Sequence, residues 1–265
     1  MTKIKIVFIS IMAVWLFNSC GTLDKTPRTN QYGPALYQSD IAYMPKPLSS
    51  DSSHHANYIS ASLVEGNGAD PTNYNDELAR GELNFGQGFT SRNFNVAYDV
   101  FGTLGSYSNV TDLATNDAHY FNNKFFGAYG GRFSVNTYIT SGRVDIRFFG
   151  FEMAFSHEFG DYANYRKLVT DSPYFYTNRR TELLTLGGTS EVVWHSHDPA
   201  IQFGFRVFLG KSLGGNSYTN NGNLTPFYNG YFNTSSLAYF MQIHRYFFVG
   251  EVNATGGQFR FGLRF

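Results

Sequence analysis

Long segments of alternating apolar and polar residues constrain the fold of this chain more than any other feature. The clearest segment places an apolar side chain at every second position, at Ile201, Phe203, Phe205, Val207 and Leu209. Because alternate side chains of a strand face opposite ways, such a segment has one apolar and one polar face. A soluble β-sandwich has the same alternation, so the period predicts strands but does not settle the class of β protein.

The spacing of these segments narrows the class. We place strands at 57–66, 79–90, 94–107, 125–139, 143–159, 182–195, 200–211, 234–243, 246–254 and 257–265. Many of them exceed the roughly 5–6 residues typical of soluble strands and suit tilted membrane strands. Short turns follow the second, fourth, sixth and eighth strands, whereas the connections at 67–78, 108–124, 160–181 and 212–233 are long. All prolines after residue 56 fall in connections, where no ladder hydrogen bond is lost.

Composition agrees with a membrane barrel. Charged residues make up only 15% of the chain and aromatic residues 18%, whereas a soluble domain has roughly 25% charged residues. Mean hydropathy is nevertheless −0.27, as expected of a wall that is apolar on one face only. Lys+Arg and Asp+Glu are equal at 20 each, so no net field favours nucleic acid as a partner.

The last residues, Phe-Arg-Phe-Gly-Leu-Arg-Phe ending at Phe265, resemble the C-terminal signature of bacterial outer-membrane barrels. The resemblance covers 57–265 and implies an all-β, antiparallel, transmembrane up-and-down β-barrel with long outer loops. It also implies that the barrel assembly machinery engages Phe265 during insertion into the outer-membrane bilayer. About ten strands are expected, with eight or twelve left open.

The N-terminus has the pattern of an export signal. Lys3 and Lys5 precede an apolar run at 6–17, which is too short to span a bilayer as a helix. The run leads into Asn-Ser-Cys-Gly, which resembles a loose bacterial lipobox around Cys20, the single cysteine. We therefore expect a lipoprotein signal peptide at 1–19 and an acylated Cys20. An ordinary signal cleaved further on is the alternative.

Residues 20–56 differ from the rest in containing half of the prolines and no sustained period. We expect a lipid-anchored, proline-rich tether or docking segment, with residues 21–56 or the outer loops binding a protein partner. With ten strands both barrel ends lie on the periplasmic side, which agrees with a lipid in the inner leaflet.

The polar faces of the strands carry charged residues that should meet inside the barrel. They form a predicted layer of four acids and four arginines at similar height: Glu82, Asp99, Arg132, Arg147, Glu191, Arg206, Glu251 and Arg260. A balanced layer is better explained as an ion-paired plug than as the unbalanced ring of a selective pore. A change of phase in the fifth strand predicts a bulge near Phe148 and Phe149.

Two groups of residues could carry other chemistry. His195 and His197 share one face of a strand end, but no third metal ligand is evident, and His54-His55 lies in a serine-rich stretch. His157, Glu158 and Asp161, with Asp112, Asp117 and His119, could activate water at the barrel rim, as in the omptin family of surface proteases. Solvated turns and polar loops are the simpler explanation of both groups, so we expect no metal and no cofactor.

The outer loops contain aromatic and Asn-rich stretches at 174–176, 218–223 and 227–232, which suit adaptable binding or sealing of the barrel mouth. The leading hypothesis is a non-enzymatic, plugged outer-membrane barrel lipoprotein, serving as a structural or accessory subunit of an outer-membrane assembly. The alternatives are a small channel or receptor for a hydrophobic or sugar ligand, and an omptin-like hydrolase at the rim.

Overall fold

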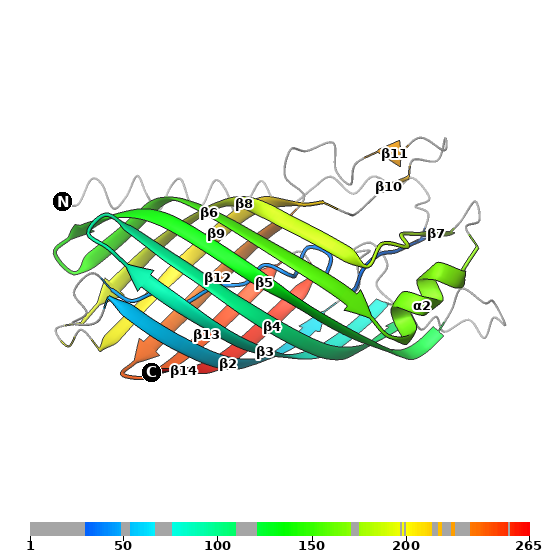
Figure 1. Ribbon diagram of the computed structural model, residues 1–265, viewed down its shortest axis with the longest axis horizontal. Coiled ribbons are helices and arrows are strands. Elements are labelled where there is room, and N and C mark those ends of the chain that lie inside the picture. Colours follow the sequence, from blue (N-terminus) through cyan, green and yellow to red (C-terminus); the bar gives the residue numbers. More distant parts are fainter. Residues whose placement is uncertain are drawn as a thin grey trace.

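The strands of the chain close into one barrel (Figure 1). A computed structural model describes residues 30–48, 54–66, 76–109, 121–170, 175–196, 198, 200–213, 217–218, 224–225, 234–253 and 255–265. The wall consists of β2 His55–Gly66, β3 Asp76–Thr90, β4 Phe94–Asn109, β5 Phe121–Ser141, β6 Val144–Phe159, β8 Glu182–His195, β9 Ile201–Leu213, β12 Thr234–Ile243, β13 Tyr246–Asn253 and β14 Gly256–Arg264. Each strand is antiparallel to its neighbours, and β14 pairs with β2 to close the ring. The predicted ten-stranded up-and-down barrel is confirmed.

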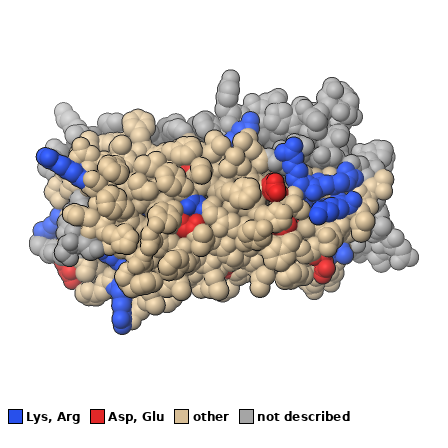
Figure 2. Space-filling model, viewed as in Figure 1, with Lys and Arg blue, Asp and Glu red and all other residues tan. Residues whose placement is uncertain are grey.

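Burial alternates along the wall as the sequence period requires. In β9, Phe203 and Phe205 are exposed on the outer face, whereas Gln202 and Arg206 are buried on the inner face. On the face shown in Figure 2, most charged side chains lie toward the two ends of the barrel, and the broad band between them is uncharged apart from a few small spots. Hydrocarbon tolerates such a wall because closure leaves no unpaired backbone edge.

The predicted bulge in β6 is present. Phe148 and Phe149 are consecutive, yet both are exposed on the outer face, and the register of β6 against β8 shifts between Arg147 and Gly150. The extra residue keeps Arg147 facing the interior before the shift and Glu152 facing it afterwards. A single bulge thus explains why the apolar residues of β6 change from one set of alternate positions to the other.

The two ends of the barrel differ. At the end we call the short-turn end, β5 and β6 are joined through Gly142 and β12 and β13 through His244, both with positive φ as tight hairpins require. The opposite end, the long-loop end, carries helix α2 (Asp161–Leu168) and strand β7 (Phe175–Thr177) (Figure 1). A separate small hairpin pairs β10 (Ser217–Tyr218) with β11 (Leu224–Thr225). No helix in the described ranges is both long and apolar enough to cross a membrane.

The segment that precedes the barrel differs from its prediction. Strand β1 (Asn30–Tyr32) pairs in parallel with β7 at the long-loop end, and residues 32–48, which we call the luminal segment, are buried except for the partly exposed Pro45. Hydrogen bonds join this segment to inward-facing side chains of β3, β5, β8 and β14. Much of the predicted tether at 20–56 therefore fills the barrel. Its prolines suit this position, because a residue without an N–H leaves no donor to satisfy.

Candidate functional site: the charged lumen

The eight charged residues predicted to face the interior all do so. Each is at most 7% exposed: Glu82 on β3, Asp99 on β4, Arg132 on β5, Arg147 on β6, Glu191 on β8, Arg206 on β9, Glu251 on β13 and Arg260 on β14. Strand pairing already brings several of them together, since Asp99 lies opposite Arg132, and Glu191 lies between Arg147 and Arg206. Opposite charges at directly paired positions attract one another across the ladder.

Four of the eight form one ion-paired group. An Nη of Arg132 lies 2.9 Å from an oxygen of Glu82 and the other Nη lies 3.5 Å from Asp99. Arg260 lies 3.2 Å from the same Glu82 oxygen, and the Arg132 guanidinium stacks 3.9 Å from the ring centre of Phe101. Two arginines thus share the carboxylate of Glu82, while Asp99 adds a second negative charge beside Arg132.

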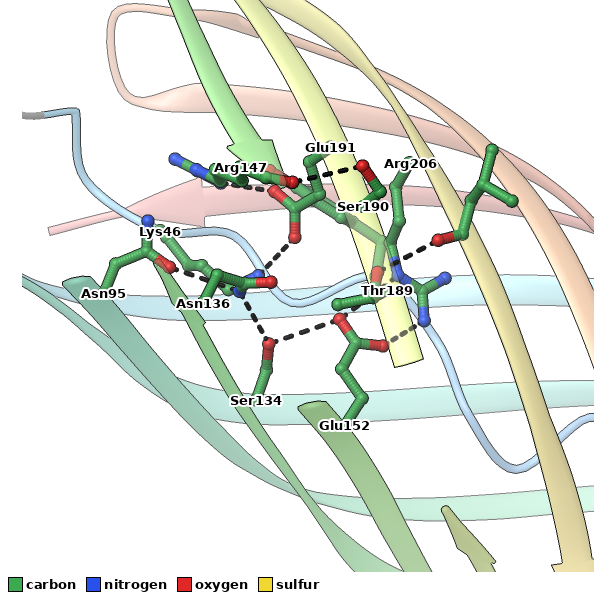
Figure 3. A network of polar contacts seen from close by, with 12 residues as sticks. Lys46, Asn95, Ser134, Asn136, Arg147, Glu152, Thr189, Ser190, Glu191 and Arg206 are labelled. Atoms are coloured by element: carbon green, nitrogen blue, oxygen red, sulfur yellow. Dashed lines mark hydrogen bonds and ion pairs between the residues drawn. The ribbon is translucent and has the colours of Figure 1, made fainter. Parts of the chain in front are cut away.

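The other four form two further ion pairs, which we treat as a second group because Glu191 lies opposite both Arg147 and Arg206 in the sheet; Figure 3 shows part of it. Arg147 pairs with Glu191, and Arg206 pairs with Glu251 at 3.1 Å. Glu152, which the sequence analysis did not single out, accepts a second ion pair from Arg206. It lies on the polar face of β6 just beyond the bulge, so the corrected period of that strand would have identified it.

The luminal segment contributes a charge of its own to this group. Lys46 donates from Nζ to Glu191 at 2.5 Å, so that Glu191 is held between Lys46 and Arg147 (Figure 3). Both Lys46 and Glu191 side chains are fully buried. Burial of an ion costs several kcal/mol in general, and close opposite charges offset that cost.

Several luminal charges bind the backbone of the segment as well as one another. Arg132 donates from Nε to the Asp40 carbonyl at 2.6 Å, and Arg80 donates to the Ser39 carbonyl at 2.8 Å. The Tyr43 amide donates to Glu251 at 3.0 Å, while Arg260 donates to the Tyr43 carbonyl at 2.9 Å. Tyr43 therefore links the two ion-paired groups through its backbone. The irregular segment has few partners of its own, and the wall supplies them.

The long-loop end of the segment is held by aromatic residues and α2. The Asn109 side-chain amide donates to the Tyr32 hydroxyl at 2.6 Å, and Tyr162 of α2 donates to the Gly33 carbonyl at 2.8 Å. The Tyr107 and Tyr162 rings stack with their centroids 4.3 Å apart. Tyr32, Tyr107 and Tyr162 belong to one buried cluster, which also contains Val64, Leu78, Phe121 and Phe126.

The described members of the rim constellation, His157, Glu158 and Asp161, are not brought together at one site. Glu158 faces the interior, where it accepts from the Ala35 amide at 2.5 Å and pairs with Arg166 at 2.5 Å. His157, its neighbour in β6, faces the other way and lies 3.7 Å from Glu182. Asp161 begins α2, whereas Asp112, Asp117 and His119 lie outside the described residues. The alternation of β6 places His157 and Glu158 on opposite faces of the wall.

The remaining sequence candidates are only partly described. His195 ends β8, and His197 lies outside the described residues, as does Cys20. Within the described ranges, no three His, Cys, Asp or Glu side chains are arranged to hold a metal. Phe265 lies at the short-turn end, where its backbone exchanges two hydrogen bonds of 3.0 Å with Asn57. Most of the predicted aromatic loop stretches are likewise outside the described residues.

A cavity of about 1280 Å³ opens toward the long-loop end beside β13, β14, β2, β3 and β4. Its inward-facing lining includes Val64, Leu78, Arg80, Ser108 and Gln258. This lining mixes apolar, hydroxyl, amide and guanidinium groups. The cavity is therefore a second candidate site, separate from the ion-paired layer except at Glu251, which lines it too.

Comparison with known proteins identifies no family for the chain. No family model and no curated protein matches the chain. Among solved structures, the translocator domain of the autotransporter NalP from Neisseria meningitidis matches 82% of this chain and 90% of its own, at 9% identity and a TM-score of 0.42. The transport unit of the autotransporter AIDA-I from Escherichia coli matches 86% and 94% of the two chains, at 10% identity and a TM-score of 0.38. The KdgM porin matches 80% and 98%, at 10% identity and a TM-score of 0.29.

These similarities concern the fold alone. The class of the chain follows from its own wall, in which exposed aromatic and aliphatic side chains surround a buried polar interior. The chain is a ten-stranded up-and-down β-barrel with the inside-out polarity of an outer-membrane protein.

Proposed function

We propose that this chain is a plugged, non-enzymatic outer-membrane barrel lipoprotein that serves as a structural or accessory subunit of an outer-membrane assembly. The observation that carries the proposal is the luminal segment, whose backbone and side chains bind the inner wall from Tyr32 to Pro47. A barrel of eight strands already encloses little more than side chains, and ten strands enclose slightly more. The segment occupies that additional room.

The electrostatics of the lumen favour a plug over a pore. Ion conduction is favoured by a ring of charges that leaves one sign unpaired along a wet path. Here Glu191 contacts Lys46 and Arg147, Glu82 contacts Arg132 and Arg260, and Arg206 contacts two glutamates. Charges paired in this way hold strands and segment together and leave little net field for a passing ion.

An accessory role fits the residues that remain available to a partner. The acid predicted to act at the rim, Glu158, is held by Arg166 and the Ala35 amide, which makes it a structural group. The chain before residue 30 and the long connections supply surface for binding, with the acylated Cys20 as anchor. Phe265 serves insertion by the assembly machinery, and no cofactor or metal is required.

Planar-bilayer recordings test the plug. The wild-type barrel should show no conductance above background, and a variant lacking residues 32–48 should conduct, provided that it migrates as a folded, heat-modifiable barrel. A matched deletion of residues 22–29, which precede the luminal segment, should stay closed. Conductance of the wild type equal to that of the variant without residues 32–48 would refute the plug.

Purification from native membranes in mild detergent tests the accessory role. We expect the barrel to elute with a stoichiometric protein partner that is lost when residues 22–29 or an outer loop are deleted. A solitary monomer in several mild detergents would argue against an assembly role.

The cavity at the long-loop end favours a second candidate function, a receptor for a small hydrophobic or sugar ligand. Pockets of roughly 300–1,000 Å³ hold small molecules in general, and this cavity of about 1280 Å³ joins Leu78 with the polar groups of Arg80 and Gln258. Native mass spectrometry of gently extracted protein should then find a bound small molecule. Its loss in Gln258→Trp, which adds a bulky ring to the cavity lining, would support the receptor function.

A further inference from the structure

The direction in which the luminal segment runs determines where its beginning leaves the barrel. At its start, Asn30–Tyr32 pairs with Phe175–Thr177 of β7, which lies between α2 and β8. Tyr32 also contacts Asn109, the last residue of β4. β4 ends and β8 begins at the long-loop end, so the segment starts there (Figure 1).

The segment ends at the opposite side of the barrel. The Pro47 carbonyl accepts from the hydroxyl of Thr90 at 2.7 Å, and Thr90 is the last residue of β3 at the short-turn end. The Thr90 amide in turn donates to the His54 carbonyl at 2.8 Å, immediately before β2 begins. Phe265 pairs with Asn57 at this same end. The described chain therefore crosses the full length of the lumen before it enters the wall.

Contacts along the whole length hold the segment in this direction. Ala35 binds Glu158, Asp40 accepts from Thr185 at 2.7 Å and Lys46 binds Glu191. These wall residues come from different depths of the lumen, so the segment cannot be reversed without breaking each contact. A loop that merely dipped into the mouth would contact residues of one end only.

We infer that the luminal segment is an additional crossing of the membrane, which places the chain before Asn30 on the face opposite to the C-terminus. In outer-membrane barrels the long loops are extracellular and the short turns periplasmic. The N-terminal residues of the mature chain are then at the cell surface. This inference rests on the proposed function only where it concerns the lipid on Cys20. An acylated Cys20 then inserts its acyl chains into the outer leaflet. Ten strands alone would have placed them in the inner leaflet.

The chain between Cys20 and Asn30 is shorter than the height of a long strand, and no path leads it back to the periplasmic side. Cys20 lies ten residues before Asn30, which in full extension reaches at most about 33–36 Å. A strand of 16 residues such as β4 is about 50 Å long and, tilted by roughly 40°, about 40 Å high. The lumen is occupied, and a path along the outer wall would expose unpaired backbone to hydrocarbon. A partner that binds the N-terminal residues is accordingly an outer-face partner, on the same side as the long loops.

Cysteine labelling in intact cells tests the inference. Lys25→Cys is compared with Arg179→Cys, an exposed position between β7 and β8, and with Arg92→Cys, an exposed position in the short turn after β3. Each is reacted with a membrane-impermeant maleimide in intact cells and again after denaturation, and the unmodified chain serves as the blank. We expect the intact-to-denatured ratio of Lys25→Cys to equal that of Arg179→Cys. A ratio equal to that of Arg92→Cys would overturn the inference.

Further outcomes of these experiments test the membrane crossing separately from the lipid anchor on Cys20. If Lys25→Cys is unlabelled even after denaturation, the mature chain begins later, the anchor fails, and Thr29→Cys decides the direction by the same ratio. If fatty-acid incorporation is absent while surface labelling persists, the anchor is refuted and the crossing stands. Periplasmic labelling of an acylated chain refutes the crossing and leaves the anchor.

Discussion

Replacement of Arg206 by alanine probes the charged lumen most directly. The Arg206 side chain is fully buried and forms ion pairs with Glu152 and Glu251. It also donates to the Ser236 hydroxyl at 2.9 Å and lies 5.3 Å from the ring centre of Phe208. Arg206→Ala removes all of these contacts at once and leaves two carboxylates without their guanidinium.

The expected loss of stability depends on which hydrogen bonds the two carboxylates keep after the substitution. Glu152 retains the Ser134 hydroxyl at 3.2 Å, and Glu251 retains the Tyr43 amide at 3.0 Å. Removal of one partner from a buried ion pair typically costs about 3–5 kcal/mol, because the other charge is left uncompensated. With two acids affected, we expect Arg206→Ala to lower the free energy of unfolding by about 4–5 kcal/mol.

A second substitution separates charge from packing. Glu152→Gln in the Arg206→Ala background removes one uncompensated charge with little change of shape, and should recover about 1–3 kcal/mol of that loss. Urea unfolding in detergent, followed by heat-modifiable migration, measures both variants. Arg92→Ala, an exposed arginine of a short turn, is the matched control and should change stability by less than about 0.5 kcal/mol. A stable Arg206→Ala barrel with altered conductance would mean that the charges are screened by water, and would refute the plug.

Three further substitutions test other parts of the proposal. Cys20→Ala should abolish incorporation of labelled fatty acid and slow maturation while the barrel still folds, and unchanged incorporation would disprove the lipobox. Deletion of Phe265, or Phe265→Asp, should delay insertion because the assembly machinery engages that residue; pulse–chase gels that show normal heat-modifiability would contradict this. Lys46→Ala leaves Glu191 to Arg147 alone and should lower the free energy of unfolding in urea by about 1–3 kcal/mol. Lys25→Ala, outside the luminal segment, is its control.

The strands of the wall could be predicted because the alternation of apolar and polar residues is a property of each strand by itself. A membrane strand needs one face for hydrocarbon and one for the interior, so the inward positions of residues such as Asp99 and Arg206 follow from counting along the strand. The bulge at Phe148 and Phe149 was predicted for the same reason, since two phases of one pattern require an extra residue. β5 extends beyond its prediction at both ends, to Phe121–Ser141, where the alternation weakens.

The luminal segment could not be predicted from a period, because it makes no ladder. Its partners are single residues scattered from Arg80 to Arg260, and only closure of the barrel brings them together. The sequence did contain a signal, since Leu36, Ile41 and Tyr43 are more apolar than a solvated tether requires. Glu158 was considered a rim group because it lies at the outer end of its strand, and its buried partner, the Ala35 amide, belongs to this same unpredicted segment.

The position of the segment also constrains the order in which the barrel closes. Its partners include Arg80 on an early strand and both Glu251 and Arg260 on the last hairpin, so they surround it completely once β14 pairs with β2. Threading afterwards from the short-turn end would draw the charges of Lys25 and Arg28 through the whole lumen, past ion pairs that are already formed, at the cost of desolvating them without a partner. We therefore expect the segment to be inside before closure. The Tyr43 backbone then offers Glu251 and Arg260 a donor and an acceptor, so that the same contacts that hold the segment in the lumen also position the hairpin that completes the wall.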